Sequence, residues 1–282
     1  MNAIHNELSY EVFVSPGVPR RTELRLPDGS GIVSSPVSST LIRGRHDSVL
    51  VDPSWTAEQT RRLADRIAAS GTRLTAIYVT HGHGDHWFGT AQLLERFPGA
   101  AVYATEGTIR LMHAQVKNRH DTWDKLFPGL IDDVPVLAQP APTSGIDLEG
   151  HKLLPIEVGH SDTDDTTVLH VPKLDLVVAG DVAYNGVHQM LLEIGNTGLQ
   201  EWLDALDVVA GLAPKAVVAG HKNVDLPDDP AVVEQTRRYL LDVRELLAAK
   251  PSPRVFFDEM ISRHPDRINP GPLWYSAVAL LD

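Results

Sequence analysis

The chain of 282 residues contains no cysteine. This absence excludes disulfide bonds and thiolate ligands, so any metal site must use histidine and carboxylate side chains. Long apolar runs are also missing, since no stretch approaches the roughly 20 residues that a membrane-spanning helix needs. Residues 1–14 lack a basic start followed by an apolar run, which predicts no signal peptide. We therefore expect a cytoplasmic protein that does not interact with a membrane.

Positive charge is scarce as well. The chain has 25 Lys and Arg against 37 Asp and Glu, which gives a formal net charge of −12. A chain this acidic is a poor partner for polyanions, so we expect a small-molecule substrate and no nucleic acid. No long linker or low-complexity segment divides the chain. The sequence therefore predicts one domain that spans residues 1–282.

Strand and helix signals alternate along the chain. Residues 39–42 and 48–51 predict paired strands, whereas residues 1–36 carry turn signals and are expected to be irregular. Residues 105–130 predict a helical insertion, which would either cover a site as a lid or pack into the core. Residues 229–282 are expected to add C-terminal helices.

The densest group of ligand-type residues is the stretch Thr80-His81-Gly82-His83-Gly84-Asp85-His86. It follows a predicted buried strand at residues 74–79 and precedes a predicted short helix at residues 87–97. Open α/β sheets bind their ligands at such strand ends. Imidazole and carboxylate groups are preferred ligands of zinc and similar metals. The pattern His-x-His-x-Asp-His at a strand-to-helix turn therefore predicts a metal site.

Three further residues of this kind follow a glycine directly after an apolar strand, namely His160, Asp181 and His221. If the ends of those strands meet at one edge, all the ligand-type side chains converge there. The complete candidate set is His81, His83, Asp85, His86, His160, Asp181 and His221. This set is too large for one catalytic zinc, which takes three protein ligands, and it suits two ions that share a carboxylate.

These motifs, in this order, resemble those of the metallo-β-lactamase superfamily over residues 37–222. The resemblance implies an α+β fold, a four-layer αββα sandwich with the metal site at the edge between two mixed sheets. It also implies two zinc ions, with iron or manganese as alternatives. By matching position, His81, His83 and His160 would hold the first metal, Asp85, His86 and His221 the second, and Asp181 would bridge them.

Two such ions would hold a bridging hydroxide, because a metal-bound water has its pKa lowered to about 7. We expect this hydroxide to attack a carbonyl of a small ester, lactone or lactam, with Asp85 orienting it. The protein would then be a metal-dependent hydrolase. Tyr184 has the same offset from Asp181 as a site tyrosine of the lactonase branch. It is either a catalytic hydrogen-bond donor or a packed core side chain.

Departures from the family patterns leave other activities open. Trp87 and Phe88 follow the histidine motif and would form either core or pocket wall, and His113 and His188 are further candidates for the pocket. Residues 161–166 resemble the corresponding stretch of true β-lactamases more than that of lactonases. The alternatives are a β-lactamase-like or thioester hydrolase, an iron-dependent redox member of the fold, a nucleic-acid-processing member, and a non-catalytic metal-binding module.

Overall fold

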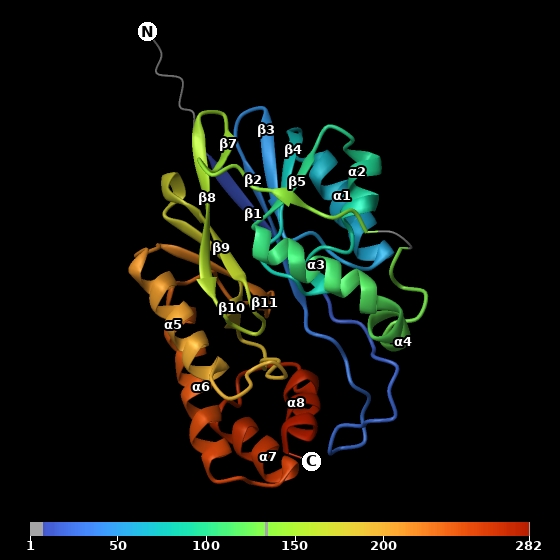
Figure 1. The fold of residues 1–282 in the computed structure, drawn as a ribbon, viewed down its shortest axis with the longest axis vertical. Helices are drawn as coiled ribbons and strands as arrows, with labels where there is room; N and C mark the ends of the chain where they lie inside the picture. Colours follow the sequence, from blue (N-terminus) through green and yellow to red (C-terminus); the bar gives the residue numbers. More distant parts are fainter. Residues whose placement is uncertain (1–7, 133–134, 282) are drawn as a thin grey trace.

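The computed structural model describes residues 8–132 and 135–281, and the expectations for residues 1–7 lie outside this range. Figure 1 shows two groups of strands with helices on their outer sides. The first half comprises β1 Ser9–Ser15, β2 Val37–Arg43, β3 Asp47–Val51, α1 Ala57–Ala69, β4 Arg73–Tyr78, α2 Thr90–Arg96, β5 Ala101–Ala104, α3 Glu106–Asn118, α4 Trp123–Leu126 and β6 Gln139–Pro140. The second half comprises β7 Ile146–Leu148, β8 His151–Gly159, β9 Thr166–Val171, β10 Leu176–Asn185, α5 Gly198–Gly211, β11 Ala216–Lys222, α6 Ala231–Ala248, α7 Pro253–Arg263 and α8 Gly271–Leu281.

The strands of the described residues form a mixed sheet in the order β6-β5-β4-β3-β2-β11-β10-β9-β8-β7, with β1 paired to β2. The two halves of this sheet meet where β2 and β11 pair, through His221 opposite Val37. The predicted α+β class is confirmed. The two sheets that we expected are joined by this pair, which brings the end of β11 to the junction of the halves.

The protein has three apolar cores. The first lies between the two halves of the sheet and includes Val51 and Tyr78 from the first half and Leu169 and Val178 from the second. A second core packs the first half against α1–α4, and a third packs the other half against α5–α8. Each half thus buries one face on helices and the other on its counterpart, which gives the layers helix, sheet, sheet and helix.

Local signals in the sequence explain the helix that follows β3. The side chain of Thr56 accepts a hydrogen bond from the backbone N–H of Gln59 at 3.2 Å and so caps the N-terminus of α1. Leu63, Ala64 and Ile67 then recur at helical spacing and are buried. The cap and the apolar stripe are the features from which this helix is predicted.

The prediction that residues 1–36 are irregular is wrong in part. Ser9–Ser15 form β1, which pairs antiparallel with β2, because Tyr10, Val12 and Val14 alternate with their neighbours at the spacing of a strand. The rest of the segment, residues 16–36, forms a long loop that reaches α8 (Figure 1). There Trp274 donates a hydrogen bond from Nε1 to the carbonyl of Arg25 at 2.7 Å.

The insertion at residues 105–130 is helical, as predicted, and contains α3 and α4. The sequence predicts that Asp181 follows the end of its strand, and this is wrong. β10 continues to Asn185, with an irregular pairing to β11 after Gly180. Across the described residues, no helix has both the length and the apolar character to span a membrane.

Candidate metal centre

The His-x-His-x-Asp-His motif follows β4 and folds into a single 3-10 turn at Gly84–His86. Trp87 donates a hydrogen bond from Nε1 to the carbonyl of Gly82 at 2.9 Å, and Phe88 packs directly against Gly84. Both aromatic side chains are fully buried in the second core, so they are core residues and not pocket walls. These two contacts hold the turn against the core, so that its histidines face the sheet edge.

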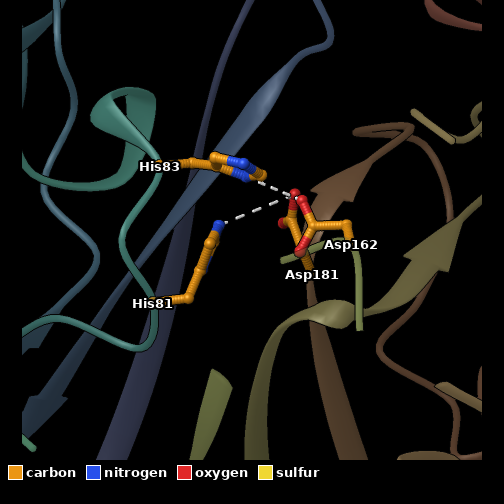
Figure 2. Close-up of side chains that lie close together, drawn as sticks. All are labelled: His81, His83, Asp162 and Asp181. Atoms are coloured by element: carbon orange, nitrogen blue, oxygen red, sulfur yellow. Dashed lines mark ion pairs between the residues drawn. The ribbon is translucent and has the colours of Figure 1, made fainter. Parts of the chain in front are cut away.

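Two groups of ligand-type side chains lie at this edge. His81, His83, Asp162 and Asp181 form the first, and within it one donor atom of each residue lies within 4.8 Å of the others. Figure 2 shows the two imidazoles, which come from the turn after β4, facing the two carboxylates across the site. Asp85, His86 and His221 form the second group, with the same closeness of donor atoms.

Asp181 connects the two groups. Its Oδ1 lies 3.3 Å from Nε2 of His86, its Oδ2 lies 3.0 Å from Nε2 of His221, and the same Oδ2 lies 4.0 Å from Nε2 of His81. The side chain is buried and stands between the groups. This is the position that a carboxylate shared by two cations would occupy.

His160 lies apart from both groups. Its Nδ1 is 2.7 Å from Asp164, and its Nε2 packs against Gly198 at the start of α5. Asp162 joins the first group, with Oδ2 at 2.8 Å from Nδ1 of His83. Asp162 is not in the set predicted from the sequence. The three aspartates at 162, 164 and 165, just after the end of β8, are the feature that indicates further ligands there.

The donor set fits cations. His81 Nε2, His86 Nε2 and Asp181 Oδ1 are buried without a hydrogen bond among the described residues, although the last two form an ion pair at 3.3 Å. Unpartnered buried polar atoms are costly, and a structure that retains several at one point needs a reason for them. Imidazole nitrogen and carboxylate oxygen are the ligands that zinc, manganese and iron accept, so divalent cations would satisfy these atoms.

The protonation of the site supports the same interpretation. Burial lowers the pKa of His81 to about 4, which leaves this imidazole neutral and able to bind a metal at pH 7. Burial acts against the charged form of His86, but Asp181 and Asp85 raise its pKa well above the usual value. Burial likewise disfavours the Asp181 carboxylate, but His221 and His86 hold its pKa well below the usual value. Binding of cations would replace these protons on the histidines.

A buried carboxylate outside the predicted set orients the histidines. Asp52, directly after β3, accepts hydrogen bonds from the N–H of Thr80 at 2.8 Å and from its Oγ1 at 2.7 Å. Its Oδ2 lies 3.2 Å from Nδ1 of His86, and Oγ1 of Thr80 lies 3.0 Å from Nδ1 of His81. Asp52 thus fixes the rings of two candidate ligands, one directly and one through Thr80.

The glycines that precede the late ligands have a steric explanation at two positions. A Cβ on Gly220 would collide with Oδ1 of Asp181, and one on Gly180 would lie 2.5 Å from Oγ1 of Thr80. Gly180 also has φ of +51°, a conformation that L-residues rarely adopt. β11 therefore approaches Asp181 closely only because Gly220 lacks a side chain, and β10 approaches Thr80 closely only because Gly180 does.

The structure shows Tyr184 as a packed side chain whose hydroxyl has one partner at the site. The side chain is fully buried and packs on Trp202, and its O–H donates a hydrogen bond to Oδ2 of Asp181 at 2.8 Å. His113 is exposed on α3, and His188 is buried with Nδ1 at 3.1 Å from the Tyr239 hydroxyl. Neither histidine lines the cavity described next.

A cavity of about 150 Å³ opens over the two groups. His83, Asp85, Asp162, Asp181, Tyr184, Glu193 and His221 form its floor, and Arg20, Ile32, Trp123, Phe127, Met190, Leu192 and Pro272 are among the residues of its walls. Trp123 and Phe127 belong to the helical insertion, which therefore contributes to the wall of the site. The walls are mainly apolar, so a substrate in this cavity would be shielded from water.

An α+β sandwich with histidines and aspartates gathered at its sheet edge defines a class of metal-site proteins. Comparison with known families identifies the class, since the profile of the Metallo-beta-lactamase superfamily matches residues 34–221. This match covers more than half of the chain. The chain belongs to the metallo-beta-lactamase superfamily, and the resemblance seen in its motifs is confirmed.

Two curated relatives and a solved structure illustrate this membership. The chain is 36% identical to a hydroxyacylglutathione hydrolase of Tolumonas auensis over 69 residues, which are 24% of this chain and 25% of the relative. It is 40% identical to one of Gloeobacter violaceus over 58 residues, 21% of each chain. The alignments thus span about a quarter of these relatives. A metallo-beta-lactamase from Pontibacter korlensis superposes with a TM-score of 0.59 at 17% identity, over 85% of this chain and 97% of that one, which shows a shared fold.

Proposed function

We propose that the protein is a dinuclear metal-dependent hydrolase that cleaves the acyl bond of a small ester, lactone or lactam. The observation that carries this proposal is the pair of donor groups joined by Asp181 on the floor of one cavity. His81, His83, Asp162 and Asp181 would hold one cation, and Asp85, His86, His221 and Asp181 the other. We propose zinc for both, with iron or manganese as alternatives that the same ligands accept.

Bound divalent cations supply a water of lowered pKa and a positive charge that polarises a carbonyl. The chain supplies the positioning. Asp85 lies on the cavity floor with Oδ2 at 3.6 Å from Nε2 of His221, where its carboxylate accepts a hydrogen bond from a water in the cavity. The Tyr184 hydroxyl donates its single proton to Oδ2 of Asp181, so it would act on the reaction by positioning that carboxylate.

A thioester hydrolase is the second candidate. The name of the curated relatives, hydroxyacylglutathione hydrolase, favours it, although the alignments cover about a quarter of those proteins. The two candidates share the cavity and the residues described above and differ in the leaving group. A small-molecule substrate is part of both proposals, because the cavity of about 150 Å³ admits little more than the reacting end of a substrate.

A substrate panel on metal-defined protein tests the proposal. Protein freed of metal and reloaded with zinc, manganese or iron is assayed on an ester, a lactone, a thioester and a β-lactam. We expect hydrolysis that depends on the metal and is lost in His83→Ala and Asp181→Ala. His113→Ala is the matched control, because this histidine is exposed on α3 and does not line the cavity. No hydrolysis of any member with both metals bound would refute the proposal.

A further inference from the structure

The most unusual side chain in the cavity wall is that of Arg20, on the long loop before β2. It is half-buried and lines the cavity together with Asp85 and Asp181. Within residues 8–132 and 135–281, it forms no ion pair and its Nε is buried without a hydrogen-bond partner. A guanidinium has five N–H donors and stays charged, so burying part of it without a hydrogen-bond partner costs free energy. A bound anion would supply that partner.

Aromatic side chains hold Arg20 in place and leave its donors free. Its guanidinium carbon lies 4.4 Å from the ring centroid of Tyr275 on α8 and 5.7 Å from that of Phe127. Cation–π contacts of this kind occupy the faces of the planar group but not its N–H edges. The side chain is therefore fixed by α8 and by the helical insertion, while its buried Nε has no hydrogen-bond partner within the described residues.

Arg20 also stands at the border between two cavities. A larger groove of about 980 Å³ lies on the other side of it, and both spaces are lined by Arg20, Ile32 and Val33. Basic side chains outnumber acidic ones in its lining, which holds Arg21, Arg25 and Lys125 against Glu23, although Lys125 is paired with Asp121 at 2.8 Å. In a chain with a net charge of −12, a basic entrance beside an acidic metal site indicates attraction of an anion.

We propose that Arg20 binds a carboxylate of the substrate and that the protein selects substrates that carry one such group a few bonds from the reacting carbonyl, in the acyl part or in the leaving group. This inference rests on the proposed function and deepens it. The planar guanidinium matches a carboxylate in geometry and forms two parallel hydrogen bonds with it. The reacting carbonyl would lie over Asp181 in the smaller cavity, and the rest of the substrate would extend past Arg20 into the groove.

Pairs of substrates that differ in this one charge test the proposal. The para-nitrophenyl hydrogen esters of succinate, glutarate and adipate carry the carboxylate in the acyl part, and their methyl esters are the neutral partners. S-Acetyl mercaptopropionate and its methyl ester place the charge in the leaving group. We expect zinc-loaded protein to hydrolyse at least one acid with kcat/KM about tenfold or more above that of its methyl ester.

Three variants test whether Arg20 causes the preference for the acid over its methyl ester. Arg20→Gln should lower kcat/KM for the preferred acid by about tenfold to a hundredfold and leave the neutral ester within about twofold. Arg20→Lys keeps the charge and should retain part of the preference. Arg61→Gln is the control, because Arg61 is exposed on α1 and lines neither cavity. An equal loss on both members of a pair would mean that Arg20 only anchors the loop, and would overturn the proposal, as would wild-type protein without a preference.

A binding measurement tests the role of Arg20 separately from the proposed hydrolase function. If no substrate is hydrolysed, the proposed function fails, and monomethyl glutarate is titrated calorimetrically into zinc-loaded wild-type and Arg20→Gln protein. We expect the variant to raise the Kd by about tenfold. An unchanged Kd, or no binding by wild-type protein, would overturn the role of Arg20 independently of catalysis.

Discussion

The carboxylate of Asp162 lies 2.8 Å from Nδ1 of His83, whereas the nearby His160 directs its own Nδ1 to Asp164. Asp162 thus belongs to the first donor group, whereas His160, which the motif match assigns to the first metal, lies outside it. Asp162→Ala should weaken binding of one of two zinc ions by at least about tenfold, measured by elemental analysis and competition with a chelator. His160→Ala should keep both ions. The reverse pattern would restore His160 as the ligand.

Gly220 provides a steric test of the bridge between the two donor groups. Because a Cβ at this position would collide with Asp181, Gly220→Ala should displace that carboxylate and lower the zinc content and turnover together. Gly211→Ala is the matched control. It lies at the end of α5 with open space around it, and alanine there should leave zinc binding unchanged. Full zinc content in Gly220→Ala would show that Asp181 does not need this close approach.

Asp52 offers a test of the groups that orient the ligands. Its carboxylate contacts His86 directly and His81 through Thr80. Asp52→Asn should therefore reduce zinc affinity by about 10- to 100-fold without removing a ligand. Asp47→Asn, at the other end of β3, breaks an exposed ion pair with Arg73 and should leave the affinity unchanged. Equal affinities in the two variants would limit Asp52 to a role in folding.

The sequence predicted those parts of the molecule that local patterns determine. Thr56 and the stripe from Leu63 to Ile67 define α1. The histidine motif was found because its residues are neighbours in the chain. Such features depend on contacts within one turn or one strand, which a pattern records directly.

Contacts between distant segments were not predictable in the same way. Asp162 was missed because its closeness to His83 depends on how β8 ends beside the turn after β4. Asp52 was missed for the same reason. The role of Arg20 depends on three segments, since the loop before β2 meets Phe127 and Tyr275 only in the folded chain. Side chains that act across the sheet junction are visible only after the halves are joined.

A variant of Tyr184 can separate the packing of its ring on Trp202 from the hydrogen bond of its hydroxyl to Asp181. Its O–H donates to Asp181, and loss of that donor should lower kcat by about tenfold while the zinc content stays the same. Tyr184→Phe keeps the ring that packs on Trp202, so the fold is preserved. Tyr239→Phe removes a buried hydroxyl at His188 and serves as the control. Unchanged turnover of Tyr184→Phe on every accepted substrate would leave it a packed side chain.

Stability should depend on pH through Glu149. Its carboxylate accepts hydrogen bonds from the backbone N–H groups of His46 at 2.6 Å, Arg45 at 2.9 Å and Asp47 at 2.8 Å. These bonds lower the pKa of Glu149 to about 2, below the value of 4.5 expected for an unfolded chain. The ionised side chain thus stabilises the hairpin between β2 and β3 at neutral pH.

The sign of the effect follows from proton uptake. Between the two pKa values the unfolded chain binds more protons than the folded one, so this stabilisation is complete above pH 4.5 and is lost as the pH falls toward 2. Glu149→Gln should therefore be less stable than wild type at pH 7, and the difference should shrink through that window in urea unfolding. Glu95→Gln, exposed on α2, should show no such trend. A difference that stays constant from pH 7 to the acid limit would assign the loss to packing and not to the charge of Glu149.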